Sequence, residues 1–122
     1  MKYRNRKVTV NGIEFDSKKE ADRYGVLLLM QRAGHITDLE LQKEYELLPA
    51  QYVNVCTADG TVKRRCAERA VKYVADFVYK CGGETVVEDV KGYRDPKGGA
   101  YAKFVLKRKL MLYVHGIRVK EI

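Results

Sequence analysis

Tryptophan is absent from this 122-residue chain, which also has only 2 prolines, 2 histidines and 3 cysteines. The cysteines, Cys56, Cys66 and Cys81, form no C-x-x-C pair and have no metal-ligand spacing with either histidine. Disulfide frameworks and zinc sites depend on such spacings, and three cysteines cannot all pair with one another. Reduced thiols are therefore expected.

Long apolar runs are also missing. The longest is VLLLM, at residues 26–30, whereas a membrane-crossing helix needs roughly 20 apolar residues. The start MKYRNRKVTV lacks the apolar core of a signal peptide. We expect a soluble, cytoplasmic protein, and the length predicts a single domain over residues 1–122.

Acidic residues are outnumbered, with 16 Asp and Glu against 24 Lys and Arg, a net charge of +8. Such an excess favours a polyanionic partner, above all nucleic acid, because bound phosphates release counterions. Residues 1–7, MKYRNRK, predict a flexible basic arm, and a second cluster comprises Lys63, Arg64 and Arg65. The alternative is that these charges only keep the surface solvated.

The pattern of apolar residues, turns and caps predicts an α/β fold, a mixed central sheet flanked by helices. Ser17 as N-cap and Gly34 as C-cap predict a helix at 18–33, and Gly116 ends a second helix. Asp59-Gly60 predicts a turn. The other predicted elements are a hairpin at 8–15, a strand and an extended piece within 36–53 separated at Pro49, strands at 69–80 and 84–93, the second helix from residue 100, and a short strand at 117–122.

The two strands around Gly82-Gly83 carry a pair of acids. If the turn is centred between these glycines, residues whose numbers sum to 165 face one another, and Asp76 lies opposite Asp89. Like charges at facing positions destabilise a sheet. A divalent ion such as Mg²⁺ would offset the repulsion, and Lys91, on the same face as Asp89, could bind a phosphate.

Three features of these acids leave alternatives open. Lys91 could simply neutralise Asp89, with a one-residue slip that sends Asp76 to the other face. Glu88 points away from Asp76 and could equally be a solvated acid near the sheet edge. Glu20 lies on the core-facing side of the first helix, but Ser17-x-x-Glu20 is also a capping box, which accounts for a Glu at that position.

Lysines interrupt the apolar stripe of the second helix. Lys103 and Lys107 either extend to the rim of that stripe or border a phosphate-binding groove that leads to Asp89 and Lys91. Lys63, Arg64 and Arg65 could extend such a groove. Tyr93 and other tyrosines could stack on bases, although most tyrosines pack in a core.

Four segments together resemble the PD-(D/E)XK nuclease superfamily, in particular its small phage and prophage members. They are the acid-bearing SKKEADRY, YVADF, VVEDVKG and the lysine-rich helix, so the resemblance runs from about Phe15 to the end. Ala75 replaces the proline of the motif, and an Asp replaces its commoner Glu at position 89. The resemblance implies a restriction-endonuclease-like fold, metal ligands Asp76, Asp89, Glu20 and the Val90 carbonyl, Lys91 as catalytic lysine, and more weakly a role for Gln42.

The resemblance implies an endonuclease that uses Mg²⁺ or Mn²⁺ to hydrolyse DNA phosphodiesters, in the cytoplasm of a bacterial host and encoded by a phage or prophage. Duplex or branched DNA is the expected substrate, including recombination junctions, whose cleavage needs two active sites and hence a homodimer. The alternative is a non-catalytic DNA-binding module in which the acids and lysine form a structural ion-pair network. An RNA-directed nuclease is a weaker third interpretation.

Overall fold

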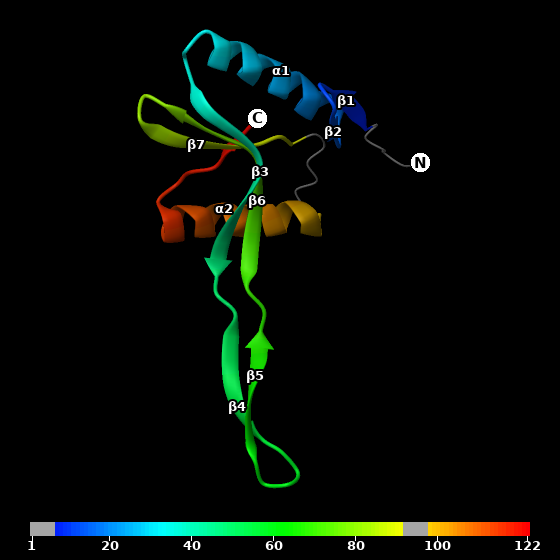
Figure 1. The fold of residues 1–122 in the computed structure, drawn as a ribbon, viewed down its shortest axis with the longest axis vertical. Helices are drawn as coiled ribbons and strands as arrows, with labels where there is room; N and C mark the ends of the chain where they lie inside the picture. The colour runs from blue at the N-terminus through cyan, green and yellow to red at the C-terminus, as the bar shows by residue number, and fades with distance from the viewer. Residues whose placement is uncertain (1–6, 92–97) are drawn as a thin grey trace.

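The computed structural model describes residues 7–91 and 98–122. Most of the predicted basic arm at 1–7, and Tyr93, lie outside these residues. The described elements are two helices and eight strands (Figure 1). They are β1 (Val8–Val10), β2 (Ile13–Phe15), α1 (Lys18–Arg32), β3 (Thr37–Leu48), β4 (Gln51–Cys56), β5 (Val62–Glu68), β6 (Val71–Cys81), β7 (Glu84–Asp89), α2 (Gly99–His115) and β8 (Lys120–Glu121).

A four-stranded sheet in the order β3-β6-β7-β8 forms the centre of the fold. Its first three strands are antiparallel, whereas β8 runs parallel to β7. Helices α1 and α2 lie on opposite sides of this sheet (Figure 1). The predicted α/β fold with a mixed sheet flanked by helices is therefore confirmed.

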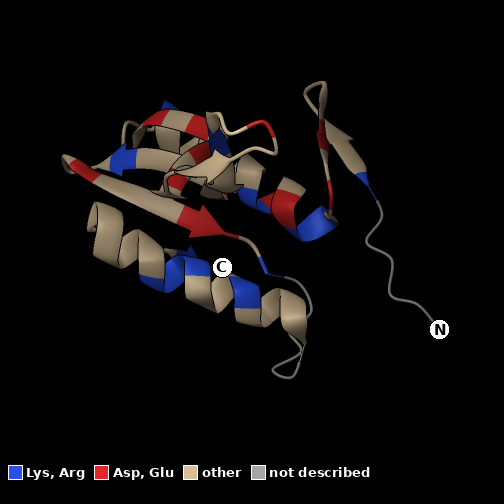
Figure 2. Cartoon of the chain, turned by 90° about the horizontal axis from the view of Figure 1, so that it is seen from below, with Lys and Arg blue, Asp and Glu red and all other residues tan. Residues whose placement is uncertain are grey.

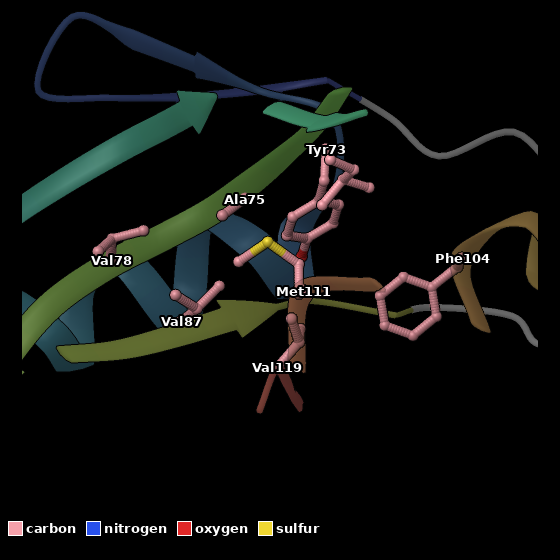
Figure 3. Close-up of a cluster of buried hydrophobic side chains, with 8 residues drawn as sticks. Tyr73, Ala75, Val78, Val87, Phe104, Met111 and Val119 are labelled. Atoms are coloured by element: carbon pink, nitrogen blue, oxygen red, sulfur yellow. The ribbon is translucent and has the colours of Figure 1, made fainter. Parts of the chain in front are cut away.

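Two apolar clusters, one under each helix, form the core. Under α1, Phe15 of the β1–β2 hairpin, Tyr24 and Leu27 pack on Phe77. Under α2, the larger cluster gathers side chains of the sheet around Met111, which is fully buried (Figure 3). Its buried members are Leu47, Tyr73, Ala75, Val78, Val87, Phe104, Met111 and Val119.

The boundaries of α1 follow from local signals. Ser17 Oγ accepts a hydrogen bond of 3.1 Å from the backbone N–H of Glu20, as an N-cap does. At the other end of α1, the N–H groups of Gly34 and His35 donate to the carbonyls of Gln31 and Met30, a Schellman arrangement with Gly34 in the left-handed region. The predicted range of 18–33 is thus confirmed to within one residue.

The side chains of β3 and β6 exchange faces midway along these strands. Residues an even number of positions apart on a strand normally share a face. Here Leu41 packs under α1 but Tyr45 under α2, and on the neighbouring strand Ala75 packs under α2 but Phe77 under α1. The exchange occurs at Gln42, whose φ of 53° lies in the left-handed region. Simple alternation therefore does not describe the middle of this sheet.

Beyond the sheet, β4 and β5 form a separate two-stranded ribbon, residues 51–68 with its turn. It extends away from both helices along the long axis of the molecule (Figure 1). Every residue of β5 is exposed, and in β4 only Val55 is partly covered. The turn at Asp59-Gly60 is predicted from the sequence, whereas the strand at 62–68 is not.

Of the described helices, neither is long and apolar enough to cross a membrane.

Candidate functional site

The β6–β7 hairpin has the register that the Gly82-Gly83 turn predicts. Cys81 pairs with Glu84 and Phe77 with Glu88, so that paired numbers sum to 165 and the next step along both strands places Asp76 opposite Asp89. The predicted register is confirmed as far as the last pair, Phe77 with Glu88, and the one-residue slip is excluded. Two carboxylates therefore lie at neighbouring positions where β7 ends.

Hydrogen bonds hold Asp76 from two directions. The backbone N–H of Val90 donates to its Oδ2 at 2.8 Å, and Gln42 Nε2 donates to its Oδ1 at 3.3 Å. The same Nε2 donates to Oε2 of Glu20 at 3.2 Å. Gln42 thus links a carboxylate of the sheet to the carboxylate of α1.

Asp89 has partners on the α2 side of the sheet. Lys91 Nζ lies 3.0 Å from its Oδ1, and the hydroxyl of the buried Tyr73 donates to its Oδ2 at 2.7 Å. The Lys91 ammonium also lies 3.9 Å from the centre of the Phe104 ring, within cation–π range. Lys91 therefore neutralises Asp89, as one of the sequence alternatives proposed. Within residues 7–91 and 98–122, Asp76 forms no salt bridge of this kind, although the charge of Lys91 also lowers its pKa.

Glu20 is almost fully buried in the first turn of α1, at 7% exposure. Burial, followed by the negative charge of Asp76, raises the pKa of this carboxyl to about 7. A backbone hydrogen bond from Asp16 opposes the rise. The Ser17 side chain caps the helix, whereas the Glu20 carboxylate faces Asp16 and the site; the capping box is therefore only half of the explanation for this residue.

Asp76 is subject to the same forces. Its pKa is raised chiefly by burial and also by the nearby charge of Asp89, while the Val90 and Gln42 hydrogen bonds lower it. The negative charges of Asp76 and Asp89 thus raise the pKa of Glu20, and the charge of Asp89 raises that of Asp76; perturbed carboxyls of this kind are typical of functional sites. A cation placed among them would relieve this repulsion.

Glu88 is not the solvated acid that the sequence analysis allowed. Its side chain is 0% exposed, and Arg23 donates to both of its oxygens, at 2.8 Å from Nε and 2.5 Å from Nη2. Tyr79 donates to it as well. A buried carboxylate needs a charged, hydrogen-bonding partner, and Arg23 of α1 provides it. The ion pair joins α1 to β7 one residue before Asp89.

Gln42 is strained where it stands. A left-handed φ is unfavourable for any residue with a Cβ, and such outliers persist where surrounding contacts enforce them. The two hydrogen bonds to Glu20 and Asp76 are contacts of this kind. The weak prediction of a role for Gln42 therefore gains a geometric basis.

We expect Gln42→Gly to be more stable than Gln42→Ala by about 1 kcal/mol, because both variants lose the amide but only glycine adopts this φ without strain. Urea denaturation at equilibrium measures the difference. At Lys43, where φ is not left-handed, the same pair of substitutions should rank in the opposite order. Equal stabilities of the two Gln42 variants would contradict the prediction.

A shallow pocket of about 340 Å³ borders the Asp89 side of the site. Lys103 and Lys107 of α2 line it together with Asp89, Lys91 and Phe104. Figure 2 shows the acidic end of β7 beside α2, which carries several basic segments. The structure thus brings both lysines to the groove that the sequence analysis considered.

The cluster of Lys63, Arg64 and Arg65 lies elsewhere. All three are exposed on β5, in the ribbon that extends away from the carboxylates (Figure 1). They do not line the pocket next to Asp89. A larger cavity of about 810 Å³ near the end of α2 is also basic, but none of the predicted site residues lines it.

The donor atoms at the site suit a hard cation. Carboxylates and a main-chain carbonyl are ligands that Mg²⁺ and Mn²⁺ prefer. Within residues 7–91 and 98–122, no three His, Cys, Asp or Glu side chains are gathered closely enough to form a ready-made metal site. To hold a metal, the Asp76 and Asp89 side chains would therefore have to move closer together. Glu20 and the Val90 carbonyl would be further ligands.

The family of this chain is known from comparisons with other proteins. Neither the curated proteins nor the solved structures contain a match. A family model described as "Protein of unknown function (DUF1064)" matches residues 1–119, nearly the whole chain. The chain therefore belongs to this family.

Proposed function

We propose that this protein is a Mg²⁺- or Mn²⁺-dependent DNA endonuclease with a restriction-endonuclease-like fold, related to the PD-(D/E)XK superfamily. The observation that carries the proposal is the meeting of Glu20 from α1, Asp76 from β6 and Asp89 with Lys91 at the end of β7. Glu20 lies far in the sequence from the β6–β7 hairpin that carries the other three residues. A fold gains no stability by gathering three carboxylates, so their proximity supports a functional role.

The reaction would be hydrolysis of a phosphodiester, in which a water oxygen bonds to phosphorus and the bond to the leaving oxygen breaks. Asp76, Asp89, Glu20 and the Val90 carbonyl would hold the metal, which when bound polarises the phosphate and the water. Lys91 would exchange its contact with Asp89 for one with the phosphate, where its charge stabilises the developing negative charge. Lys103 and Lys107 would hold neighbouring phosphates along the pocket.

The proposed substrate is duplex or branched DNA in phage replication or recombination. The excess of positive charge and the lysines beside Asp89 support a nucleic acid. A junction substrate would require two copies of the site and therefore a homodimer.

One observation favours the non-catalytic alternative. Lys91 and Tyr73 already engage both oxygens of Asp89, as they would in a structural network within a DNA-binding module. The two functions differ in their need for metal, and one experiment separates them.

Linear, flapped and four-way-junction DNA should be incubated with the protein and Mg²⁺, Mn²⁺ or EDTA. We expect cutting that depends on metal and disappears in Asp89→Asn and in Lys91→Ala, while the exposed-acid control Asp22→Asn cuts normally. The preferred substrate identifies the class of nuclease. Intact, metal-indifferent binding without any cutting would instead establish the binding module.

A further inference from the structure

The β4–β5 ribbon is an unusual structure to leave in solvent. A two-stranded hairpin is marginally stable by itself, and this one contributes none of its residues to either buried cluster. It nevertheless exposes half or more of Tyr52 and Val62. Exposed apolar side chains of this kind often mark a surface that a partner covers.

Basic side chains occupy both faces of the ribbon. Lys63 and Arg65 point to one face, and Arg64, which lies over the Tyr52 ring at 4.2 Å, points to the other. Among the residues that the structure describes, none of these three cations forms an ion pair. Their charges are therefore available to a polyanion.

The acids of the ribbon do not cancel this charge where it lies. Asp59 is in the turn, where Thr57 and Thr61 donate hydrogen bonds to it and lower its pKa. Glu68 is at the opposite end, where β5 stops. The middle of the ribbon thus remains positive on both faces.

We propose that the β4–β5 ribbon inserts into the major groove of duplex DNA, at a distance from the site where the phosphodiester is cut. The major groove of B-DNA accommodates a two-stranded ribbon and has phosphates along both walls, which matches cations on both faces. The major groove of duplex RNA is too deep and narrow for the same fit. A second copy of this chain is a poorer partner, because it would bring like charges together. The inference rests on the proposed nuclease function only for the position of the cut.

The chain limits the distance between the ribbon and the cut. Arg64 and Asp76 are 12 positions apart, which at about 3.3 Å per residue span at most about 40 Å. One turn of B-DNA is about 34 to 36 Å. The ribbon would therefore contact the duplex within about one helical turn of the scissile phosphate.

Binding without metal tests this proposal independently of cleavage. The full chain and the triple variant K63Q/R64Q/R65Q are titrated with a duplex of about two turns in EDTA, over a range of salt. We expect affinity at least about 10-fold lower in the variant and a salt slope smaller by about 2 to 3, since each lost phosphate contact removes about 0.9. The control K80Q removes one exposed charge at the end of β6 that is farther from the ribbon. It should leave the affinity unchanged and alter the salt slope by no more than about one unit.

The exposed native cysteines locate the contact. A photo-crosslinker on Cys66 in the C56S/C81S chain should react with the duplex within about one turn of the cut, and one on Cys81 in the C56S/C66S chain should not. Unchanged affinity in the triple variant, equal losses on duplex RNA, or a variant that converts a dimer to a monomer would each overturn the proposal. Because the titration is done in EDTA, failure of the nuclease function would leave the affinity result unaffected.

Discussion

Arg23→Ala is expected to lower the free energy of unfolding by about 3 to 5 kcal/mol, because it leaves the Glu88 carboxylate charged and buried without its partner. The pair is bidentate, and Glu88 is fully buried. Urea denaturation at equilibrium gives the value directly. The control Lys18→Ala breaks an exposed pair with Asp22 on the same helix and should cost less than about 1 kcal/mol.

A second substitution separates the charge from the contact. In Arg23→Ala/Glu88→Gln the buried carboxylate is gone, so that much of the lost stability should return. If the single and double variants were equally unstable, the loss would come from the packing of the Arg23 side chain and not from an unpaired charge. Because this pair joins α1 to β7 beside Asp89, Arg23→Ala should also displace Glu20 from the site.

The Glu20 carboxyl should make stability depend on pH. Its pKa is about 7 in the folded protein, against an ordinary value of 4.5. The folded state therefore holds a proton that the unfolded state has lost between these values, and stability falls as pH rises from about 4.5 to 7. A shift of this size corresponds to at most about 3 kcal/mol, less any screening by solvent.

Glu20→Gln should remove this part of the pH dependence, because the amide does not titrate and Ser17 still caps the helix. Denaturation curves at several pH values compare the variant with wild type and with the exposed-acid control Asp22→Asn. We also expect the variant to lose metal-dependent cleavage while keeping or gaining stability near pH 8. Parallel stability profiles for Glu20→Gln and wild type would refute the electrostatic account, and a marked loss of stability would restore the capping role.

The ends of α1 and the register of the β6–β7 hairpin were predictable because their sequence signals are local. The caps at Ser17 and Gly34 lie within a few residues of the backbone groups they satisfy, and the Gly82-Gly83 turn determines the register that pairs Asp76 with Asp89. The same register predicts that Lys91 lies on the same face as Asp89. These predictions required no knowledge of distant contacts.

The remaining features depend on contacts that the sequence does not reveal. Glu88 finds its partner 65 positions earlier, so that no spacing rule connects it with Arg23. The exchange of faces at Gln42 depends on a left-handed backbone conformation, which a glutamine in the sequence does not predict. The strand at 62–68 was missed because both of its faces are exposed, so that it shows no alternation of apolar and polar residues.

The ribbon is structurally independent of the core, and this affects how members of the family can differ from one another. Its residues enter neither buried cluster, and Leu48 pairs with Val71 just where the ribbon joins the sheet. One hairpin could therefore be shortened, lengthened or exchanged between relatives without repacking the core or moving the carboxylates. Under the proposed function, DNA contact by the ribbon and cleavage at the carboxylates would then vary independently of one another within one small chain.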